Sequence, residues 1–338
     1  MIGSLEVVPY ALPFAEPYVT VRGRLERREL VLVRLHADGI VGLGETTSLS
    51  LRGGGGLEAI VQELRSVRPD QLEGDERSRS ALSTEARAAL EIALLDLAGK
   101  VAGVPAWKML GADAVRPIEC NATLTAGTPA DVAAQARAWA ERGFETFKLK
   151  VGMEGDVAQV AAARQALEGD ARLRVDANGA WDVPQAVERL ASMGPLELAE
   201  QPVGTLEELR ELQSLTAVPL AADESVVTRG DARAAAGACR YATVKLAKVG
   251  GPRAALAIAD ELPVYLSSAL DGPVGIAAAA HVAQALPDAG VAHGLATSLL
   301  FAETVGHGAH LEGSLLCVGD GAGLGVELDD DALSRFAL

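Results

Sequence analysis

The sequence contains few aromatic residues and few cysteines, and each shortage excludes a class of structure. Aromatic residues make up 4% of the 338 residues, whereas alanine and glycine are abundant. This composition suits close packing of helices on a sheet better than a β-sandwich. The cysteines lie far apart without paired spacing, so neither a disulfide framework nor a cysteine zinc site is expected, and a reducing cytoplasm fits. They are Cys120, Cys239 and Cys317.

The chain also lacks an excess of positive charge and a long apolar run. It has 30 Lys and Arg against 46 Asp and Glu, a formal net charge of −16. Neither nucleic acid nor an anionic membrane is attracted to an acidic surface, so neither is expected as a partner, and no protein partner is implied. No apolar run approaches the roughly 20 residues of a membrane-spanning helix. The first residues do not combine a basic region with an apolar core, so no signal peptide is predicted.

Apolar residues, at 49% of the chain, suffice for a large core in one barrel or two domains. Residues 1 to about 35 alternate apolar and polar side chains, which predicts antiparallel strands with a polar loop at about Pro13 to Arg24. Four consecutive glycines predict a mobile loop at 51–56, and no Gly-Lys-Ser or Gly-Lys-Thr follows that would make it a phosphate-binding loop. A helix is predicted from Ser83 or Thr84 to Gly99.

From about residue 118 the pattern changes to alternating strands and helices. A first strand at 118–123 precedes a helix that Thr128 caps and Gly143 ends. A seventh strand is predicted at 264–268, a helix at 275–286 and a weaker eighth strand at 291–295, which together complete a right-handed βα barrel. The last forty or so residues are expected to pack on the N-terminal domain. The strands between end at Lys150, Asp176, Glu200, Asp223 and Lys245, at intervals of 22 to 26 residues.

Three of these strand ends carry a carboxylate, at Asp176, Glu200 and Asp223. In a parallel barrel the strands' carboxyl ends open on one mouth, so the three side chains can converge. Without a cation they would repel one another and resist ionisation. Oxygen ligands favour Mg²⁺, with Mn²⁺ as the second choice, over zinc. Each acid alone could cap the helix that follows its strand, but three on adjacent strands beside lysines favour the metal site.

Lysines flank the three acids. Lys148 and Lys150 alternate along one strand, so both face the barrel mouth, and Lys245 enters from the opposite side. A lone barrel lysine would most often be an ion-pair partner, but two ammonium groups beside a dication favour loss of a proton from one, which then serves as a base. A carboxylate substrate on the metal would lose its α-proton, because the cation stabilises the enediolate that forms.

In these motifs the sequence resembles the enolase superfamily, and within it the muconate lactonizing enzyme subgroup. The resemblance implies an α/β fold, a (β/α)7β modified TIM barrel at 116–299 with an N-terminal α+β capping domain. The capping domain would occupy 1–115, completed by about 300–338, with the 13–24 and 51–56 loops closing over the substrate. The matching segments are 93–100, 148–150, 176–181, 200–202, 223–225 and 245–251.

The resemblance also implies roles for the strand-end residues. Asp176, Glu200 and Asp223 would bind magnesium. Among the lysines, Lys150 would be the base, Lys245 would act on the opposite face of the substrate, and Lys148 would orient its neighbour. Lys248 is left out of the site because it lies an odd number of residues past Lys245, beyond the strand end.

The subgroup does not fix the reaction. Mandelate-racemase-like members carry a histidine on the seventh strand, where this chain has none, and His281 falls in a helix and is expected to serve packing. The Asp-x-Asp motif of dipeptide epimerases is missing near His293. Residues 267–275 resemble o-succinylbenzoate synthases of actinobacterial type, which dehydrate a cyclohexadiene carboxylate in menaquinone synthesis. Ser268 and Asn178 are then expected to contact the substrate.

Three other readings stay open. An N-succinylamino acid racemase or dipeptide epimerase would use both lysines to exchange the α-proton. A Schiff-base aldolase would form an imine on a barrel lysine and would need no metal. A non-catalytic barrel would bind magnesium without exchanging the α-proton of any carboxylate.

Overall fold

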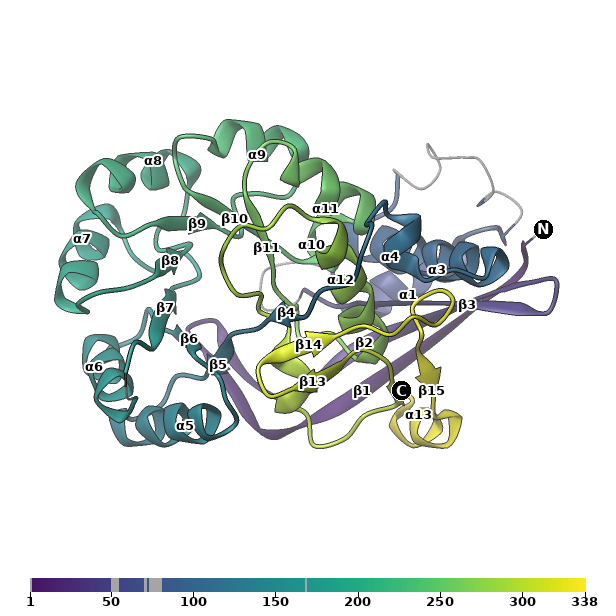
Figure 1. Ribbon diagram of the computed structural model, residues 1–338, viewed down its shortest axis with the longest axis horizontal. Coiled ribbons are helices and arrows are strands. Elements are labelled where there is room, and N and C mark those ends of the chain that lie inside the picture. Colours follow the sequence, from purple (N-terminus) through teal and green to yellow (C-terminus); the bar gives the residue numbers. More distant parts are fainter. Residues whose placement is uncertain (1, 50–54, 70–71, 73–80, 168) are drawn as a thin grey trace.

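A computed structural model describes residues 2–49, 55–69, 72, 81–167 and 169–338 (Figure 1). Residues 51–54 of the glycine-rich loop, which we expected to close over the substrate, lie outside the described residues.

The N-terminal part of the chain is an antiparallel three-stranded sheet with a helical layer (Figure 1). β2 lies between β1 and β3, and the helix α3 lies along β3 and β2. This part matches the expected α+β domain. Its elements are β1 (Ile2–Thr20), β2 (Gly23–Ala37), β3 (Ile40–Thr47), α1 (Leu57–Ser66), α3 (Thr84–Ala102) and α4 (Ala106–Met109).

The prediction of a polar loop from Pro13 to Arg24 is wrong. β1 continues to Thr20 and pairs with β2 through Thr20↔Gly23, so the two strands form one long hairpin. β1 is an edge strand, and its register shifts between Pro13 and Tyr18. An edge strand with an irregular register tolerates proline, which lacks the N–H that a central strand needs.

The helix α3 begins where the sequence predicted it. The Ser83 hydroxyl accepts a hydrogen bond from the Ala86 N–H at 3.2 Å and caps the helix. The helix ends at Ala102 rather than Gly99, and Gly103 takes the left-handed conformation (φ 66°) that terminates it.

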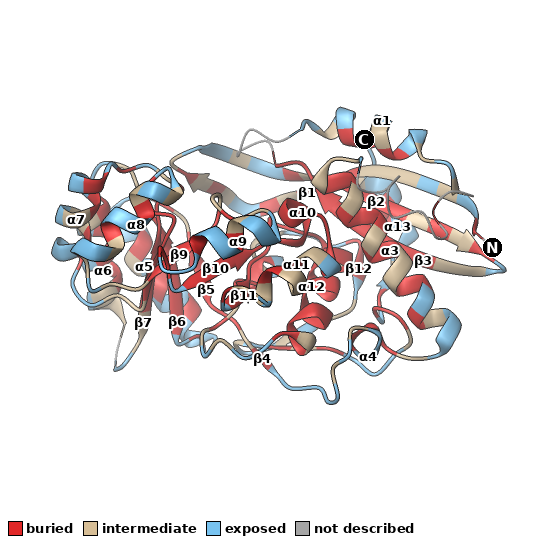
Figure 2. Cartoon of the chain, turned by 90° about the horizontal axis from the view of Figure 1, so that it is seen from above, coloured by how far each residue is buried: buried red, intermediate tan, exposed pale blue. Residues whose placement is uncertain are grey.

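A parallel sheet of seven strands forms the second part, with helices on its outside (Figure 1). Each strand pairs with the one before it in the chain, in the order β11-β10-β9-β8-β7-β6-β5. Figure 2 shows that the strands are buried, whereas several outer helices expose one face. The strands are β5 (Ala122–Leu124), β6 (Thr146–Lys150), β7 (Arg172–Asp176), β8 (Leu198–Glu200), β9 (Leu220–Ala222), β10 (Tyr241–Val244) and β11 (Val264–Leu266).

Four of the helices that cover the sheet, α5, α7, α8 and α9, start at side-chain caps. Thr128, Asp182, Thr205 and Thr228 each form a capping box with the residue three positions later, which fixes where the chain turns back after a strand. The helices are α5 (Pro129–Glu141), α6 (Asp156–Ala166), α7 (Val183–Ser192), α8 (Leu206–Leu215), α9 (Arg229–Ala235), α10 (Leu246–Val249), α11 (Pro252–Ala259) and α12 (Pro273–Ala285).

Two predicted strands differ from the structure. The strand at 118–123 divides into β5 and β4 (Ile118–Glu119), because β4 pairs with a C-terminal strand instead. The eighth strand at 291–295 forms only two isolated bridges, Cys120↔His293 and Ser267↔Gly294. Each bridge involves one residue of this segment. Together they connect Ser267, which follows β11, to Cys120 at the beginning of the sheet. The α/β modified TIM barrel is confirmed.

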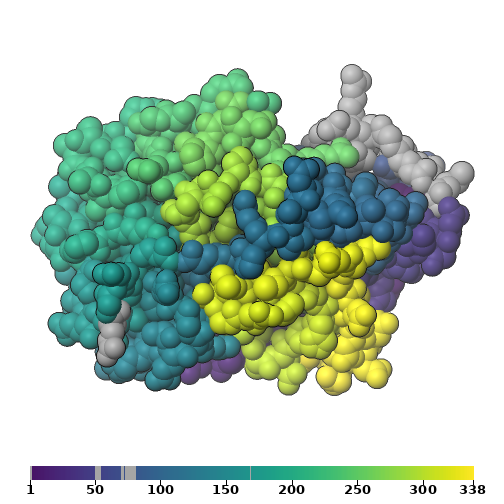
Figure 3. All heavy atoms as spheres, viewed as in Figure 1, coloured from purple at the N-terminus to yellow at the C-terminus, as the bar shows by residue number. Residues whose placement is uncertain are grey.

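The C-terminal residues return to the N-terminal sheet (Figure 3). Asp96 of α3 is fully buried and accepts hydrogen bonds from the N–H groups of Leu43 and Leu324, both at 2.7 Å. Ala337 bridges to Tyr10 of β1. The division into domains at 115 and 300 stays a prediction. This segment contains η3 (Ala296–Leu300), β12 (Gly306–His307), β13 (His310–Glu312), β14 (Leu315–Cys317), β15 (Glu327–Leu328) and α13 (Asp330–Phe336).

All three cysteines are free thiols, as predicted. Among the described residues, no helix combines the length and the apolar character that a bilayer crossing requires.

The helix α3 packs so closely on β3 that Gly44 leaves no room for a side chain. A Cβ added at Gly44 would meet the backbone carbonyl oxygen of Ala89 and the side chain of Ala93. Gly44→Ala should therefore lower the free energy of unfolding by about 1–3 kcal/mol through overpacking, measured by denaturant titration. Gly56→Ala is the matched control, because a Cβ there meets nothing within 4 Å. Equal stability of the two variants would contradict the packing described here.

Candidate active site

Five neighbouring strands each have a charged residue at or directly after their ends, at the barrel mouth. In spatial order these are Lys150 at the end of β6, Asp176 at the end of β7, Glu200 at the end of β8, and Asp223 and Lys245 directly after β9 and β10. The register pairs Lys150 with Asp176 and Asp176 with Glu200. The structure therefore brings together the acids and lysines that the sequence singled out, with a lysine on each side of the acids.

On the β6 side, lysine ammonium groups lie between carboxylates. Lys150 Nζ is 2.5 Å from Asp176 Oδ2 and donates to Asn178 Oδ1 at 3.3 Å. Lys148 Nζ lies 3.0 Å from Glu200 Oε2 and 3.6 Å from Asp176 Oδ2. The two acids are fully buried and the two lysines nearly so. Paired charges make this burial tolerable.

On the β10 side, two lysines hold Asp223. Lys245 Nζ forms an ion pair with Asp223 Oδ2 and lies 3.9 Å from Glu200 Oε1. Lys248 Nζ donates to Asp223 Oδ1 at 2.9 Å and to the Thr243 carbonyl at 2.9 Å. Omitting Lys248 from the site was therefore wrong. The alternation of a strand ends at β10, and the helical turn α10 rotates Lys248 back toward the mouth.

Burial and neighbouring charge shift the two central acids in opposite directions. Burial alone would raise the pKa of Asp176, but the charges of Lys150 and Lys148 outweigh it and hold that pKa below its ordinary value. Burial, together with the charge of Asp176, raises the pKa of Glu200. A second negative charge beside Asp176 is therefore unfavourable at the buried Glu200, and a cation there would relieve it.

The donor set fits a hard divalent cation. All three acids offer only oxygen, the ligand atom that Mg²⁺ prefers. Within the described residues, Glu200 Oε1 is buried and accepts no hydrogen bond, so one ligand oxygen is available. Asp176, Glu200 and Asp223 could hold such an ion.

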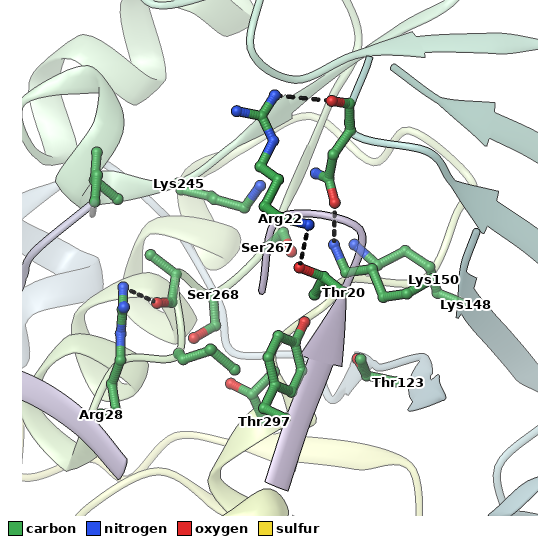
Figure 4. A pocket seen from close by; sticks show the side chains of 15 residues that line it. Thr20, Arg22, Arg28, Thr123, Lys148, Lys150, Lys245, Ser267, Ser268 and Thr297 are labelled. Carbon is green, nitrogen blue, oxygen red and sulfur yellow. Dashed lines mark hydrogen bonds between the residues drawn. The ribbon is translucent and has the colours of Figure 1, made fainter. Parts of the chain in front are cut away.

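A pocket lies above these charges, between the barrel and the β1–β2 hairpin. Figure 4 shows Lys245 entering from one side and Lys148 and Lys150 from the other. Arg22, in the hairpin turn, donates to the Asn178 carbonyl oxygen at 2.8 Å and so ties the hairpin to the barrel. The hairpin thus lies over the site, as expected of residues 13–24, although as strands rather than a loop.

Both residues expected to contact substrate line this pocket. Asn178 follows β7 in a left-handed conformation (φ 48°) and donates to Glu224 Oε1 at 3.1 Å. The Ser268 hydroxyl donates to Asp271 Oδ2 at 3.1 Å and accepts from the Asp271 N–H at 2.8 Å. Ser268 therefore also shapes the turn that leads into α12. Their contact with substrate stays a prediction.

Two residues of the N-terminal sheet, Arg28 and Glu45, lie near the pocket and were not predicted from the sequence. Arg28 of β2 is buried, lines the pocket and donates to the Ala269 carbonyl oxygen at 2.8 Å. Glu45 of β3 accepts from the Tyr10 hydroxyl at 2.7 Å and from the Gly275 N–H of α12 at 3.1 Å, and burial raises its pKa to about 7. No signal in the sequence distinguishes Arg28, which stands in the charged run at 26–29, whereas Glu45 is the one charged residue of β3.

The two histidines considered in the sequence lie outside the pocket. His281 is buried in α12, where Nδ1 accepts from the Trp107 N–H at 3.2 Å, so its packing role is confirmed. His293 Nδ1 accepts from the Leu266 N–H at 3.0 Å, and burial together with the charge of Arg174 lowers its pKa to about 4. Both rings hold the backbone.

A second group of ligand-type side chains lies on the C-terminal hairpin. Among the described residues, His310, Glu312 and Cys317 have ligand atoms that all lie within 4.8 Å of one another, closer than the three barrel acids. His310 and Glu312 are exposed and contact each other at 3.4 Å. An exposed contact of this kind needs no cation, whereas the buried barrel acids are separated by the lysines between them.

Two family models together match most of the chain. One, described as Enolase C-terminal domain-like, matches residues 131–332, and the other, the Mandelate racemase / muconate lactonizing enzyme N-terminal domain, matches residues 3–111. Muconate cycloisomerase 1 of Pseudomonas putida is 30% identical over 362 residues, which cover 98% of this chain and 96% of that protein.

Other relatives differ in reaction. o-Succinylbenzoate synthase of Thermobifida fusca (strain YX) is 43% identical over 191 residues, covering 53% of this chain and only 59% of the synthase. The dipeptide epimerase from Enterococcus faecalis V583, complexed with Mg and the dipeptide L-Leu-L-Tyr, has a TM-score of 0.89 at 29% identity, covering 96% and 99% of the two chains. The family models and the relative matched along its whole length show that this chain belongs to the enolase superfamily, in its mandelate racemase and muconate lactonizing enzyme family.

Proposed function

We propose that the protein is an o-succinylbenzoate synthase. It would dehydrate 2-succinyl-6-hydroxy-2,4-cyclohexadiene-1-carboxylate to o-succinylbenzoate in menaquinone biosynthesis. The observation that carries the proposal is the row of strand ends from Lys150 through the three acids to Lys245, in a chain 43% identical to a synthase over half its length.

Asp176, Glu200 and Asp223 would hold Mg²⁺, or Mn²⁺ in its place. When bound, the ion would neutralise the ring carboxylate of the substrate and so favour loss of the neighbouring proton. Enzymes of the superfamily are known in complex with Mg, as in the dipeptide epimerase above.

Lys150, in its neutral form, removes the proton from the ring carbon that bears the carboxylate. The electrons of that C–H bond form a new double bond as the C–O bond to the ring hydroxyl breaks. Lys150 then returns the proton to the departing oxygen, so one water leaves and the ring becomes aromatic. Lys245 steadies the ring from the opposite face, and Lys148 lies beside Asp176 and Glu200.

Two arginines in the pocket support a substrate with a second carboxylate. Arg22, in the turn of the β1–β2 hairpin, and Arg28, on β2, both line the pocket. A succinyl arm that ends in a carboxylate would meet positive charge there. Ala269, whose carbonyl oxygen accepts from Arg28, lines the pocket with only a methyl side chain.

The second candidate is an N-succinylamino acid racemase or dipeptide epimerase. It is supported by the same pair of opposed lysines and by the likeness to the dipeptide epimerase structure. In that reaction one lysine removes the α-proton and the other delivers a proton to the opposite face. The two functions differ in their products and share the site.

Removing the amine of Lys150 should abolish dehydration. Lys150→Met is expected to lower kcat/KM by about 10²–10⁴-fold, the usual contribution of a positioned base, measured by product formation with Mg²⁺. Lys108→Met is the matched control, since Lys108 is exposed outside the pocket. Retention of most activity by Lys150→Met would show that another group is the base.

Solvent deuterium separates the two candidate functions. In D₂O, the synthase should release o-succinylbenzoate and water in equal amounts from the cyclohexadiene substrate, and should leave N-succinylamino acids unlabelled. Mass spectrometry of recovered substrate measures this. Deuterium at the α-carbon of an N-succinylamino acid, without dehydration of the cyclohexadiene, would assign the protein as a racemase.

Metal removal tests the ligand assignment. Dialysis against EDTA should abolish activity, and Mg²⁺ or Mn²⁺ should restore it, because three buried carboxylates need a cation to align the substrate. Glu200→Gln should need much more Mg²⁺ for half-maximal activity. Full activity in EDTA, with borohydride trapping of substrate on a lysine, would instead favour a Schiff-base aldolase.

A further inference from the structure

The two oxygens of Glu200 have different surroundings. Oε2 accepts hydrogen bonds from Lys148 Nζ at 3.0 Å and from the Tyr265 hydroxyl at 2.8 Å. Oε1 accepts none among the described residues, and Lys245 Nζ lies 3.9 Å from it. Two donors on one oxygen fix the rotation of the carboxylate, so the other oxygen has a defined direction.

Tyr265 supplies one of these donors from across the barrel. It lies on β11, is fully buried, and its register partner on β10 is Thr243. The Thr243 hydroxyl donates to the Tyr265 hydroxyl oxygen at 2.6 Å. Because a phenol carries one proton and its oxygen already accepts from Thr243, that proton points to Glu200.

The surroundings of Tyr265 hold its ring in place. The ring is fully buried, and the guanidinium carbon of Arg174 lies 5.3 Å from its centre. The hydrogen bonds run in one direction, from Thr243 through Tyr265 to Glu200, and each strengthens the next.

We propose that Tyr265 is a positioning residue for the metal site. Its hydroxyl holds Glu200 Oε2, so that Oε1 would be the oxygen offered to the cation. The inference rests on the proposed function in one respect, that Asp176, Glu200 and Asp223 bind Mg²⁺. Lys148 alone would hold Oε2 less firmly, because a lysine amine rotates on a flexible stem whereas the phenol is rigid. Tyr265 touches no substrate and takes no part in the proton transfer.

The test compares Mg²⁺ binding by the full-length wild-type protein and Tyr265→Phe, both dialysed against EDTA, by isothermal titration calorimetry. The variant removes one oxygen and keeps the ring. We expect its Kd for Mg²⁺ to rise about tenfold, within the range for loss of a group that orients a metal ligand. The thermal midpoint of the metal-free variant should stay close to that of the wild type, and excess Mg²⁺ should restore its kcat.

Two further variants control for structural damage. Tyr241→Phe removes a phenol oxygen from the same buried cluster, where the two rings pack edge to face at 6.4 Å, and should leave the Kd for Mg²⁺ unchanged. Thr243→Val removes the donor to Tyr265 and should weaken Mg²⁺ binding less than Tyr265→Phe does. The double variant of Thr243 and Tyr265 should bind no more weakly than Tyr265→Phe, because both changes break one chain of hydrogen bonds.

The outcomes separate the two proposals. If the wild type binds no Mg²⁺, the proposed function fails and the inference fails with it. If the wild type binds Mg²⁺ and Tyr265→Phe binds it equally tightly, only the positioning role is overturned. Equal weakening by Tyr241→Phe and Tyr265→Phe would also overturn that role, since the loss would then reflect a general change in the barrel.

Discussion

Strand register is the constraint on which the site depends. Lys150, Asp176 and Glu200 are consecutive partners across β6, β7 and β8, and neighbouring strands lie only about 4.8 Å apart. Burying one such charge alone costs several kcal/mol, but next to an opposite charge the cost is largely offset. A shift of one residue in either pairing would turn a charge toward the outer helices. The alternation of apolar residues along each strand therefore also fixes the chemistry of the mouth.

The strand ends were predictable because each is marked twice, by a short apolar run and by a polar residue where the run stops. Asp176 and Glu200 carry both marks, and their neighbours recur at intervals that one strand and one helix fill. The capped start of α3 at Ser83 was predictable for a similarly local reason. These features depend on residues close together in the chain, where propensity and pattern act directly.

The remaining features depend on partners far away in the chain. Lys248 reaches Asp223 only because the chain leaves β10 as a helical turn, which a strand pattern does not contain. Tyr265 looks like any core residue of an apolar strand until β8 is placed opposite it. β1 accommodates Pro13 because it is an edge strand, and the position of a strand in its sheet depends on its partners. The catalytic and metal-binding roles of the strand-end residues stay predictions, since proximity alone assigns no reaction.

The buried centre and the whole molecule carry opposite charge. With every side chain ionised, the lysines and acids around the mouth give a formal balance of 4 − 3 = +1, whereas the chain as a whole carries −16. These residues are Lys148, Lys150, Lys245 and Lys248 with Asp176, Glu200 and Asp223. An anion approaching from solvent is therefore repelled at long range and attracted only after entering the mouth. Since dissolved salt screens distant surface charges more than buried ones, the repulsion fades in salt while the attraction persists. An anion that binds in this mouth would therefore be selected by shape and short-range contact, without long-range electrostatic guidance.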